Sequence, residues 1–160
     1  MENNKRSCGA ITYISNSPVQ TFSLGKKLGM LLKKGDLIAL DGDLGAGKTC
    51  LIQGITHGLK SKSNASSPSF SIIKEYQGNI PIYHFDLYRL NHQEEIEELG
   101  YEEYFYGNGI TLIEWANKIK NYLPDELLLV KIKMSKEYLK RTIIFKPIGD
   151  GYRNLMEELK

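Results

Sequence analysis

The segment GDLGAGKT, residues 42–49, carries residue types that bind phosphate groups. It fits the pattern G-x-x-x-x-G-K-[ST], with Gly42, Gly47, Lys48 and Thr49 at the fixed positions. In such a loop the glycines let backbone N–H groups approach the phosphates. The lysine reaches the terminal phosphates, and the hydroxyl binds Mg²⁺. The segment therefore predicts a site for a phosphorylated ligand.

The residues around this loop predict a strand before it and a helix after it. The run LIAL, residues 37–40, is typical of a short buried strand. Apolar residues at helical spacing follow the loop, at Leu51, Ile52, Ile55 and Leu59. A helix there points its N-terminal N–H groups at a bound anion, so strand, loop and helix come in the order that a phosphate site needs. The alternative is a glycine turn that merely precedes a helix.

A bound Mg²⁺ also needs carboxylate oxygens, and two candidates stand at the ends of predicted strands. Asp86 ends IPIYHFD (80–86), and Glu114 ends ITLIE within ITLIEW (110–115). Both can emerge at the sheet edge where the loop lies. The pattern does not decide which one touches the metal, because strand-end carboxylates often only cap or pair. His84 has no second histidine at ligand spacing, so we expect a hydrogen-bonded structural residue.

The remaining elements predict an α/β fold with a mixed, mostly parallel central sheet, flanked by helices and extended by antiparallel hairpins. Ser17 is a candidate helix cap ahead of Pro18, and Gly35 is a stop signal after Lys34. Strands are expected at 11–14, 37–40, 70–76, 80–86, 110–115, 127–134 and 141–146, and helices at 18–34, after the glycine loop, at 94–103 and at 152–159. The polar stretch 60–69 is expected to be an exposed loop.

Length and composition favour one globular, soluble domain over residues 1–160. The net charge of +2 gives no overall argument for binding nucleic acid or a membrane. Cys8 and Cys50 form no C-x-x-C pair, which argues against a disulfide framework or a zinc site. No run approaches about 18 apolar residues, and no apolar region follows the N-terminal charges. We therefore expect a cytoplasmic protein with no membrane segment.

Three other segments allow a functional interpretation beside an ordinary one. The hydroxyls of Ser66, Ser67 and Ser69 could form a switch that senses a γ-phosphate, or simply stabilise a loop. The glutamates of 94–103 could bind a basic partner, or form the solvated face of a helix. The lysines of 131–146 could face RNA or an acidic partner, or stand on an outward strand face.

Taken together, these motifs resemble the TsaE family (also called YjeE), the bacterial ATPase of tRNA threonylcarbamoyladenosine (t6A) biosynthesis. YHFDLYRL and IEW are more specific to this family than the phosphate loop is. The resemblance implies a P-loop NTPase fold with ATP and Mg²⁺ as cofactors. The matching segments, in the family's order, are TFSLG (21–25), GDLGAGKTC (42–50), SPSF (67–70), YHFDLYRL (83–90), ELG (98–100), IEW (113–115) and LP (123–124).

The resemblance also implies a role for each matching residue. Thr49 and Glu114 would bind Mg²⁺, Lys48 would act in catalysis, and Asp86 would hold the metal from its second shell or place the attacking water. The implied ATP-binding residues are Thr21, Gly45, Ala46, Gly47, Lys48, Thr49, Cys50, Trp115 and Arg141. Cys50 stands where the family usually has threonine, and Ser69 stands where it usually has the threonine of SPT. Both keep small polar side chains, so ATP binding is still expected.

The implied partners are TsaB and TsaD, of which TsaD transfers the threonylcarbamoyl group to adenosine 37; tRNA would be reached indirectly, through that complex. A small-molecule or nucleoside kinase uses the same loop and is the main alternative, with a nucleotide-binding module that lacks turnover as a third. A kinase usually has a lid with clustered arginines, whereas the four arginines here, Arg6, Arg89, Arg141 and Arg153, are scattered. Without an obvious arginine finger, we expect slow hydrolysis alone and faster hydrolysis with partners.

Overall fold

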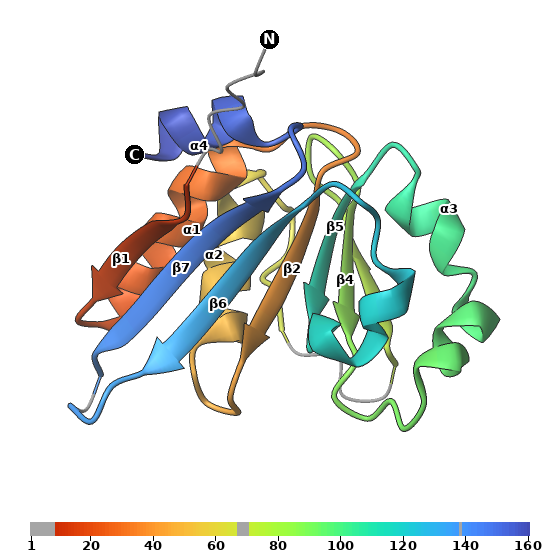
Figure 1. The fold of residues 1–160 in the computed structure, drawn as a ribbon. Helices are drawn as coiled ribbons and strands as arrows, with labels where there is room; N and C mark the ends of the chain where they lie inside the picture. The colour runs from red at the N-terminus through yellow and green to blue at the C-terminus, as the bar shows by residue number, and fades with distance from the viewer. Residues whose placement is uncertain (1–8, 67–70, 138) are drawn as a thin grey trace, which may run out of the picture.

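A computed structural model describes residues 9–66, 71–137 and 139–160 of the chain. These residues build a seven-stranded sheet with helices packed on both of its faces (Figure 1). Ser67, Ser69 and the segment SPSF lie outside the described residues. The predicted mixed α/β fold with flanking helices is confirmed.

The strand order explains how parallel and antiparallel pairs share one sheet. From one edge to the other the order is β1-β7-β6-β2-β5-β4-β3. The four strands β6, β2, β5 and β4 are parallel to one another, whereas β1–β7, β7–β6 and β4–β3 are antiparallel. Both predicted hairpins are present. The strands are β1 (Ile11–Ser15), β2 (Leu37–Gly42), β3 (Ile73–Tyr76), β4 (Ile82–Asp86), β5 (Ile110–Glu114), β6 (Leu127–Met134) and β7 (Arg141–Ile148).

The helices are α1 (Pro18–Leu31), α2 (Lys48–Gly58), α3 (Tyr101–Phe105) and α4 (Arg153–Leu159), with 3₁₀ helices η1 (Gln93–Leu99) and η2 (Ala116–Tyr122). Ser17 caps α1 as predicted, because its side chain accepts a hydrogen bond from the Gln20 N–H. The predicted end of α1 at Lys34 is wrong. The Asp36 carboxylate instead accepts from the backbone N–H of Lys33, 2.7 Å away, and holds the chain in a turn.

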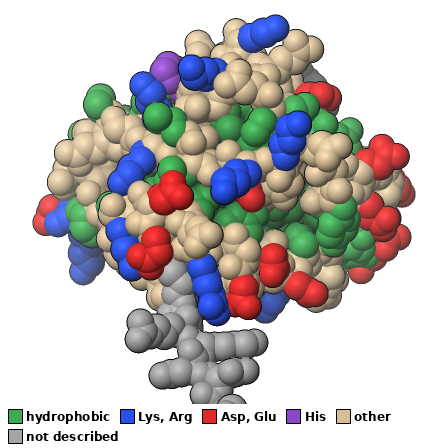
Figure 2. All heavy atoms as spheres, turned by 90° about the horizontal axis from the view of Figure 1, so that it is seen from above, with side chains coloured by type: hydrophobic (Ala, Val, Ile, Leu, Met, Phe, Trp, Pro, Cys, Tyr) green, Lys and Arg blue, Asp and Glu red, His purple; other side chains and the backbone are tan. Residues whose placement is uncertain are grey.

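The prediction of one helix over 94–103 is also wrong. Gly100 lies between η1 and α3 with a left-handed φ of 64°, which ends one helical segment and starts the next. The glutamates of this region are exposed as expected, at Glu94, Glu97, Glu98, Glu102 and Glu103. Figure 2 shows acidic side chains gathered along the right-hand margin, the side on which Figure 1 places α3.

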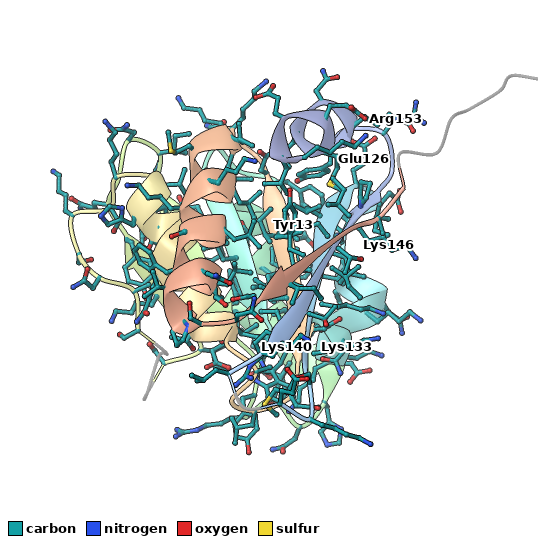
Figure 3. All side chains as sticks on the ribbon, turned by 90° about the vertical axis from the view of Figure 1, so that its left-hand side faces the viewer. Tyr13, Glu126, Lys133, Lys140, Lys146 and Arg153 are labelled. Atoms are coloured by element: carbon teal, nitrogen blue, oxygen red, sulfur yellow. The ribbon has the colours of Figure 1, made fainter. Side chains whose placement is uncertain are left out.

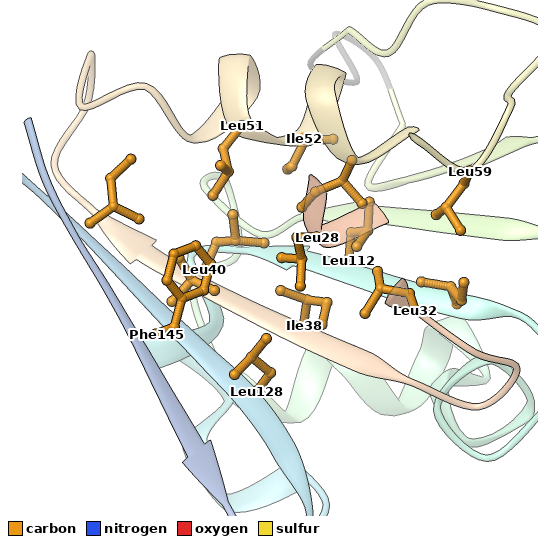
Figure 4. Packing of buried hydrophobic residues seen from close by; sticks show 14 of the residues in the cluster. Leu28, Leu32, Ile38, Leu40, Leu51, Ile52, Leu59, Leu112, Leu128 and Phe145 are labelled. Atoms are coloured by element: carbon orange, nitrogen blue, oxygen red, sulfur yellow. The ribbon is translucent and has the colours of Figure 1, made fainter. Parts of the chain in front are cut away.

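Alternation along β2 divides its hydrophobic residues between two cores. Ile38 and Leu40 pack against α1 and α2, together with residues of β5, β6 and β7 (Figure 4). Leu37 and Ala39 point to the opposite face, which η1, η2 and α3 cover. Because both of its faces are buried, this strand reads as an unbroken apolar run in the sequence.

Helices α1 and α2 approach each other closely through glycines. A Cβ atom at Gly25 or Gly29 of α1 would overlap a backbone carbonyl oxygen of α2, and a Cβ at Gly54 or Gly58 of α2 would overlap one of α1. The two backbones therefore pack directly against each other over two turns. This contact fixes the position of α2, which begins at the phosphate loop.

The lysines of 131–146 stand mainly on an outward strand face, which agrees with the ordinary interpretation. Lys131 and Lys133 alternate with the buried residues of β6, and Lys146 is exposed on β7. Figure 3 shows Lys133 and Lys140 near the connection between these strands, with Lys146 further along β7. Whether this face meets RNA stays a prediction. Within the described ranges, no helix is both long and apolar enough to cross a bilayer.

Candidate phosphate-binding site

The glycine loop joins the end of β2 to the start of α2, as predicted. Residues 42–49 are called the P-loop below. Strand β2 ends at Gly42, and Gly47 is the N-cap of α2. Gly45 and Gly47 have φ values of 80° and 106°, which side-chain-bearing residues rarely adopt. These turns bring backbone N–H groups to the N-terminus of an eleven-residue helix, where an anion is stabilised.

Lys48 is buried inside the loop, with only 5% of its surface exposed. Its Nζ donates to the carbonyl oxygens of Gly42 and Asp43, the latter 3.0 Å away, and lies 4.1 Å from the centre of the Trp115 ring. Burial lowers the pKa of Lys48 below its usual value, and the charges of Glu114 and Asp43 oppose this shift. A buried ammonium group favours an anionic partner.

Glu114 stands at the end of β5, beside β2, and is 3% exposed. Its Oε1 accepts a hydrogen bond from Thr49 Oγ1 at 3.3 Å. Its Oε2 lies 2.8 Å from His84 Nε2. The P-loop hydroxyl and a strand-end carboxylate, far apart in sequence, are therefore in direct contact.

Asp86 lies next to Glu114, because the two residues are register partners in the parallel pair β4–β5. The Asp86 Oδ1 accepts from the backbone N–H of Tyr88 at 3.1 Å. Burial raises the pKa of Asp86, the hydrogen bond from Tyr88 lowers it, and the charge of Glu114 raises it again. Two carboxylates thus stand side by side at the sheet edge that carries the P-loop.

On its other side, the P-loop borders a small pocket. Thr21, Cys50 and Arg141 line this pocket together with Gly45, Ala46 and Gly47. Arg141 Nε donates to the carbonyl oxygen of Ala46 at 3.1 Å, and Cys50 Sγ donates to that of Pro18 at 3.3 Å. Arg141 therefore braces the loop through its carbonyl oxygens.

Thr21 is held in this pocket by the end of β1. Its hydroxyl lies 2.7 Å from Ser15 Oγ, and Ser15 Oγ donates to the carbonyl oxygen of Ser17 at 2.9 Å. Since the one hydroxyl hydrogen of Ser15 is used there, Thr21 is the donor of the pair. Its oxygen keeps the capacity to accept.

Trp115 adopts a left-handed backbone conformation, with φ of 61°, which is rare for a bulky residue. Its backbone N–H donates to the carbonyl oxygen of Leu40 at 3.1 Å, which continues the contact between β5 and β2. The indole packs against the ring of Tyr88 at 5.2 Å between centroids, as well as against Lys48. This conformation places the indole on the P-loop lysine.

All the predicted site residues lie around the P-loop, in two groups. Lys48, Thr49, Asp86, Glu114 and Trp115 form one group, and Thr21, Cys50 and Arg141 form the other with the loop backbone. Their chemical roles stay predictions.

The prediction for His84 is confirmed, since this residue is fully buried and both ring nitrogens have hydrogen-bond partners. What the sequence reasoning missed is that one partner is Glu114 and the other is Tyr76. The signal that could have predicted the contact with Glu114 is the alternation of side chains along the two strands. His84 and Asp86 are two residues apart on β4, so they share a face, and the same alternation puts Glu114 on that face of β5.

The donor set fits Mg²⁺. A threonine hydroxyl and two carboxylates offer only oxygen atoms, which this hard cation prefers. Magnesium usually binds one or two carboxylates together with phosphate oxygens and water, and the P-loop supplies the place for such phosphates.

A glycine loop between a buried strand and a helix, with carboxylates at the ends of the neighbouring strands, defines a P-loop nucleotide-binding protein. Residues 15–143 match the family model described as threonylcarbamoyl adenosine biosynthesis protein TsaE. The chain belongs to the TsaE family, so the resemblance found in the sequence is confirmed.

Individual relatives agree with this assignment. The chain is 43% identical over 144 residues to the tRNA threonylcarbamoyladenosine biosynthesis protein TsaE of Bacillus subtilis, covering 89% of both proteins. It is 34% identical to the protein of that name from Treponema pallidum, covering 76% of this chain and 90% of the relative. The crystal structure of Bacillus subtilis YdiB superposes with a TM-score of 0.80 at 38% identity, covering 94% of this chain and 93% of YdiB.

Proposed function

We propose that this chain is the ATP-binding and ATP-hydrolysing subunit required for threonylcarbamoylation of adenosine 37 in tRNA. It acts in the cytoplasm with TsaB and TsaD, as one ATPase domain over residues 1–160, and reaches tRNA through that complex. The observation that carries the proposal is the contact between Thr49 of the P-loop and Glu114, in a member of the TsaE family.

In the proposed reaction, water attacks the γ-phosphoryl group in line with the departing ADP oxygen. A new P–O bond forms to water as the bond to ADP breaks. The water gives up a proton to the Asp86 carboxylate or to solvent, and the products are ADP and phosphate. The P-loop amides and Lys48 stabilise the negative charge on the phosphoryl oxygens. Thr49 and Glu114 would hold Mg²⁺, which would supply further charge neutralisation when bound.

Asp86 is proposed to place the attacking water or a water of the metal shell. Its carboxylate neighbours Glu114 on the next strand, and the Tyr88 N–H holds one of its oxygens. Burial raises its pKa, which makes it a better proton acceptor than an exposed aspartate. The pocket lined by Thr21, Cys50 and Arg141 is the proposed site for the nucleoside.

The arginines support the expectation of slow hydrolysis without partners. Arg141 donates to carbonyl oxygens of the P-loop, Arg153 pairs with Asp150 at 2.6 Å, and Arg89 is exposed. Among the described residues, these arginines do not form the cluster that a kinase lid needs, so the kinase alternative gains no support. A partner is expected to complete or order the site.

Glu114→Ala is expected to impair Mg²⁺-dependent nucleotide binding more than Asp86→Ala does, because Glu114 contacts the P-loop hydroxyl directly. Binding of a non-hydrolysable ATP analogue is measured by calorimetry with Mg²⁺ and with EDTA. The gain in affinity from Mg²⁺ should fall at least about tenfold in Glu114→Ala. Asp86→Ala should keep most of this gain while losing turnover. The opposite order would exchange the two roles.

The function itself is tested by reconstitution. TsaB and TsaD are supplied with tRNA, ATP and a threonylcarbamoyl donor, and modified tRNA is counted per TsaD molecule. Addition of this chain should allow repeated rounds of modification. Equal yields with and without the chain would contradict the proposed role.

A further inference from the structure

A buried series of hydrogen bonds connects the P-loop to the backbone at Ser66. Glu114 contacts Thr49 through one oxygen and His84 Nε2 through the other, at 3.3 and 2.8 Å. His84 Nδ1 lies 3.1 Å from the Tyr76 hydroxyl. That hydroxyl lies 3.0 Å from the carbonyl oxygen of Ser66 and 3.1 Å from its N–H. The series crosses strands β3, β4 and β5.

Because these side chains are buried, loss of any of their hydrogen bonds would be costly in free energy. His84 is fully buried, Tyr76 is 1% exposed and Glu114 is 3% exposed. In the part of the chain that the structure describes, every buried side-chain polar atom has a hydrogen-bond partner. A buried carboxylate that lost its partner would stay desolvated and uncompensated, so Glu114 depends on His84 for one of its two oxygens.

The direction of the hydrogen bonds follows from counting hydrogens. An ionised Glu114 only accepts, so His84 Nε2 carries the hydrogen and is the donor. The Tyr76 hydroxyl has one hydrogen. If it goes to His84 Nδ1, the imidazole is neutral; if it goes to the Ser66 carbonyl oxygen, Nδ1 must carry a second hydrogen and donate to the Tyr76 oxygen as an imidazolium. In both arrangements His84 donates to Glu114 Oε2, and Oε1 is left facing Thr49.

The sheet register fixes this geometry. His84 pairs with Leu112, so Glu114, two residues further along β5, is its diagonal neighbour on the same face. Tyr76 of β3 pairs with Ile82, two residues before His84 on β4. The tyrosine, histidine and glutamate therefore follow one another across three hydrogen-bonded strands.

We propose that His84 is a positioning residue for the metal-binding carboxylate of Glu114, and that Tyr76 holds His84 in place for this task. His84 donates from Nε2 to Glu114 Oε2 and thereby orients Oε1 toward the P-loop hydroxyl. The inference rests on the proposed role of Glu114 in binding Mg²⁺.

Two substitutions of His84 separate positioning from packing. Glutamine places its amide nitrogen close to the position of Nε2, whereas asparagine, one methylene shorter, reaches only the position of Nδ1. The full chain is titrated with a non-hydrolysable ATP analogue, with Mg²⁺ and with EDTA. His84→Asn should lower the affinity gain from Mg²⁺ by about tenfold to 100-fold, and His84→Gln should keep most of it. Binding in EDTA should change little in both variants.

Two further variants serve as controls. Tyr76→Phe keeps the ring but removes the hydroxyl, and should give a smaller loss of the Mg²⁺ effect than His84→Asn. Thr111→Val removes another side-chain hydrogen bond of β5, the one that the buried Thr111 donates to the Tyr104 carbonyl oxygen at 3.0 Å. It should leave the Mg²⁺ effect unchanged even where it lowers the melting temperature.

The outcomes distinguish the positioning role of His84 from the proposed metal site at Glu114. The positioning role would be overturned if His84→Gln and His84→Asn lost the same share of the affinity gain from Mg²⁺. It would also be overturned if the loss of this gain in all variants followed only their melting temperatures. Loss of the Mg²⁺ effect in Glu114→Gln but not in His84→Asn would overturn this inference alone. An unchanged Mg²⁺ effect in Glu114→Gln would overturn the proposed metal site itself.

Discussion

Lys48→Ala is expected to reduce ATP hydrolysis by at least about 100-fold. The ammonium group is buried inside the P-loop and is the cationic side chain at its centre. Alanine would therefore remove the positive charge that we propose stabilises the transferring phosphoryl group. Nucleotide binding should weaken as well, because in the proposed mechanism the lysine contacts phosphate before and during the reaction. Steady-state release of phosphate, with binding measured separately, tests both effects.

Lys146→Ala is the matched control for this variant. It removes the same charge from an exposed position on β7, away from the P-loop (Figure 3). Hydrolysis by Lys146→Ala should equal that of the unchanged chain. A Lys48→Ala protein that folds normally and hydrolyses ATP at the original rate would show that turnover does not arise at this loop.

Gly54→Ala is expected to lower the free energy of unfolding by about 1–3 kcal/mol. Alanine is normally the better helix residue, so a glycine inside a helix usually costs stability. Here the added methyl group would overlap the carbonyl oxygen of Phe22 in α1, and the two helices would have to separate. For a chain of 160 residues the melting temperature should fall by about 2–4 °C per kcal/mol.

Ser23→Ala on the exposed side of α1 is the control, because it adds helix propensity without touching α2. Its melting temperature should be unchanged or slightly higher. Because α2 begins at the P-loop, Gly54→Ala should also weaken nucleotide binding. A melting temperature for Gly54→Ala at or above that of the unchanged chain would show that the helices are not in direct backbone contact.

Local patterns explain why the P-loop and most of the sheet could be predicted. The loop pattern, the apolar run of β2 and the helical spacing of α2 each depend on residues close together in sequence. The predicted ends of the strands placed Asp86 and Glu114 at the sheet edge that carries the P-loop. The family resemblance added Trp115 and Thr21. These residues do lie around the P-loop.

The features that escaped prediction depend on residues far apart in sequence. The hydrogen bonds from Tyr76 to His84 and from His84 to Glu114 require the order of three strands, which no local pattern gives. The left-handed conformation of Trp115 has no signal in its residue type. The glycine contact between α1 and α2 is visible as a spacing of four residues in each helix, but its meaning requires the two helices to be neighbours.

ATP hydrolysis by the purified chain, alone and with TsaB, TsaD and tRNA, tests the central claim most directly. Lys48→Ala serves as the blank in each mixture. We expect slow release of phosphate by the chain alone and clear stimulation by the partners, with the stimulated rate lost in Lys48→Ala. An equal rate with and without the partners, or no hydrolysis in either case, would contradict the account of a partner-dependent ATPase.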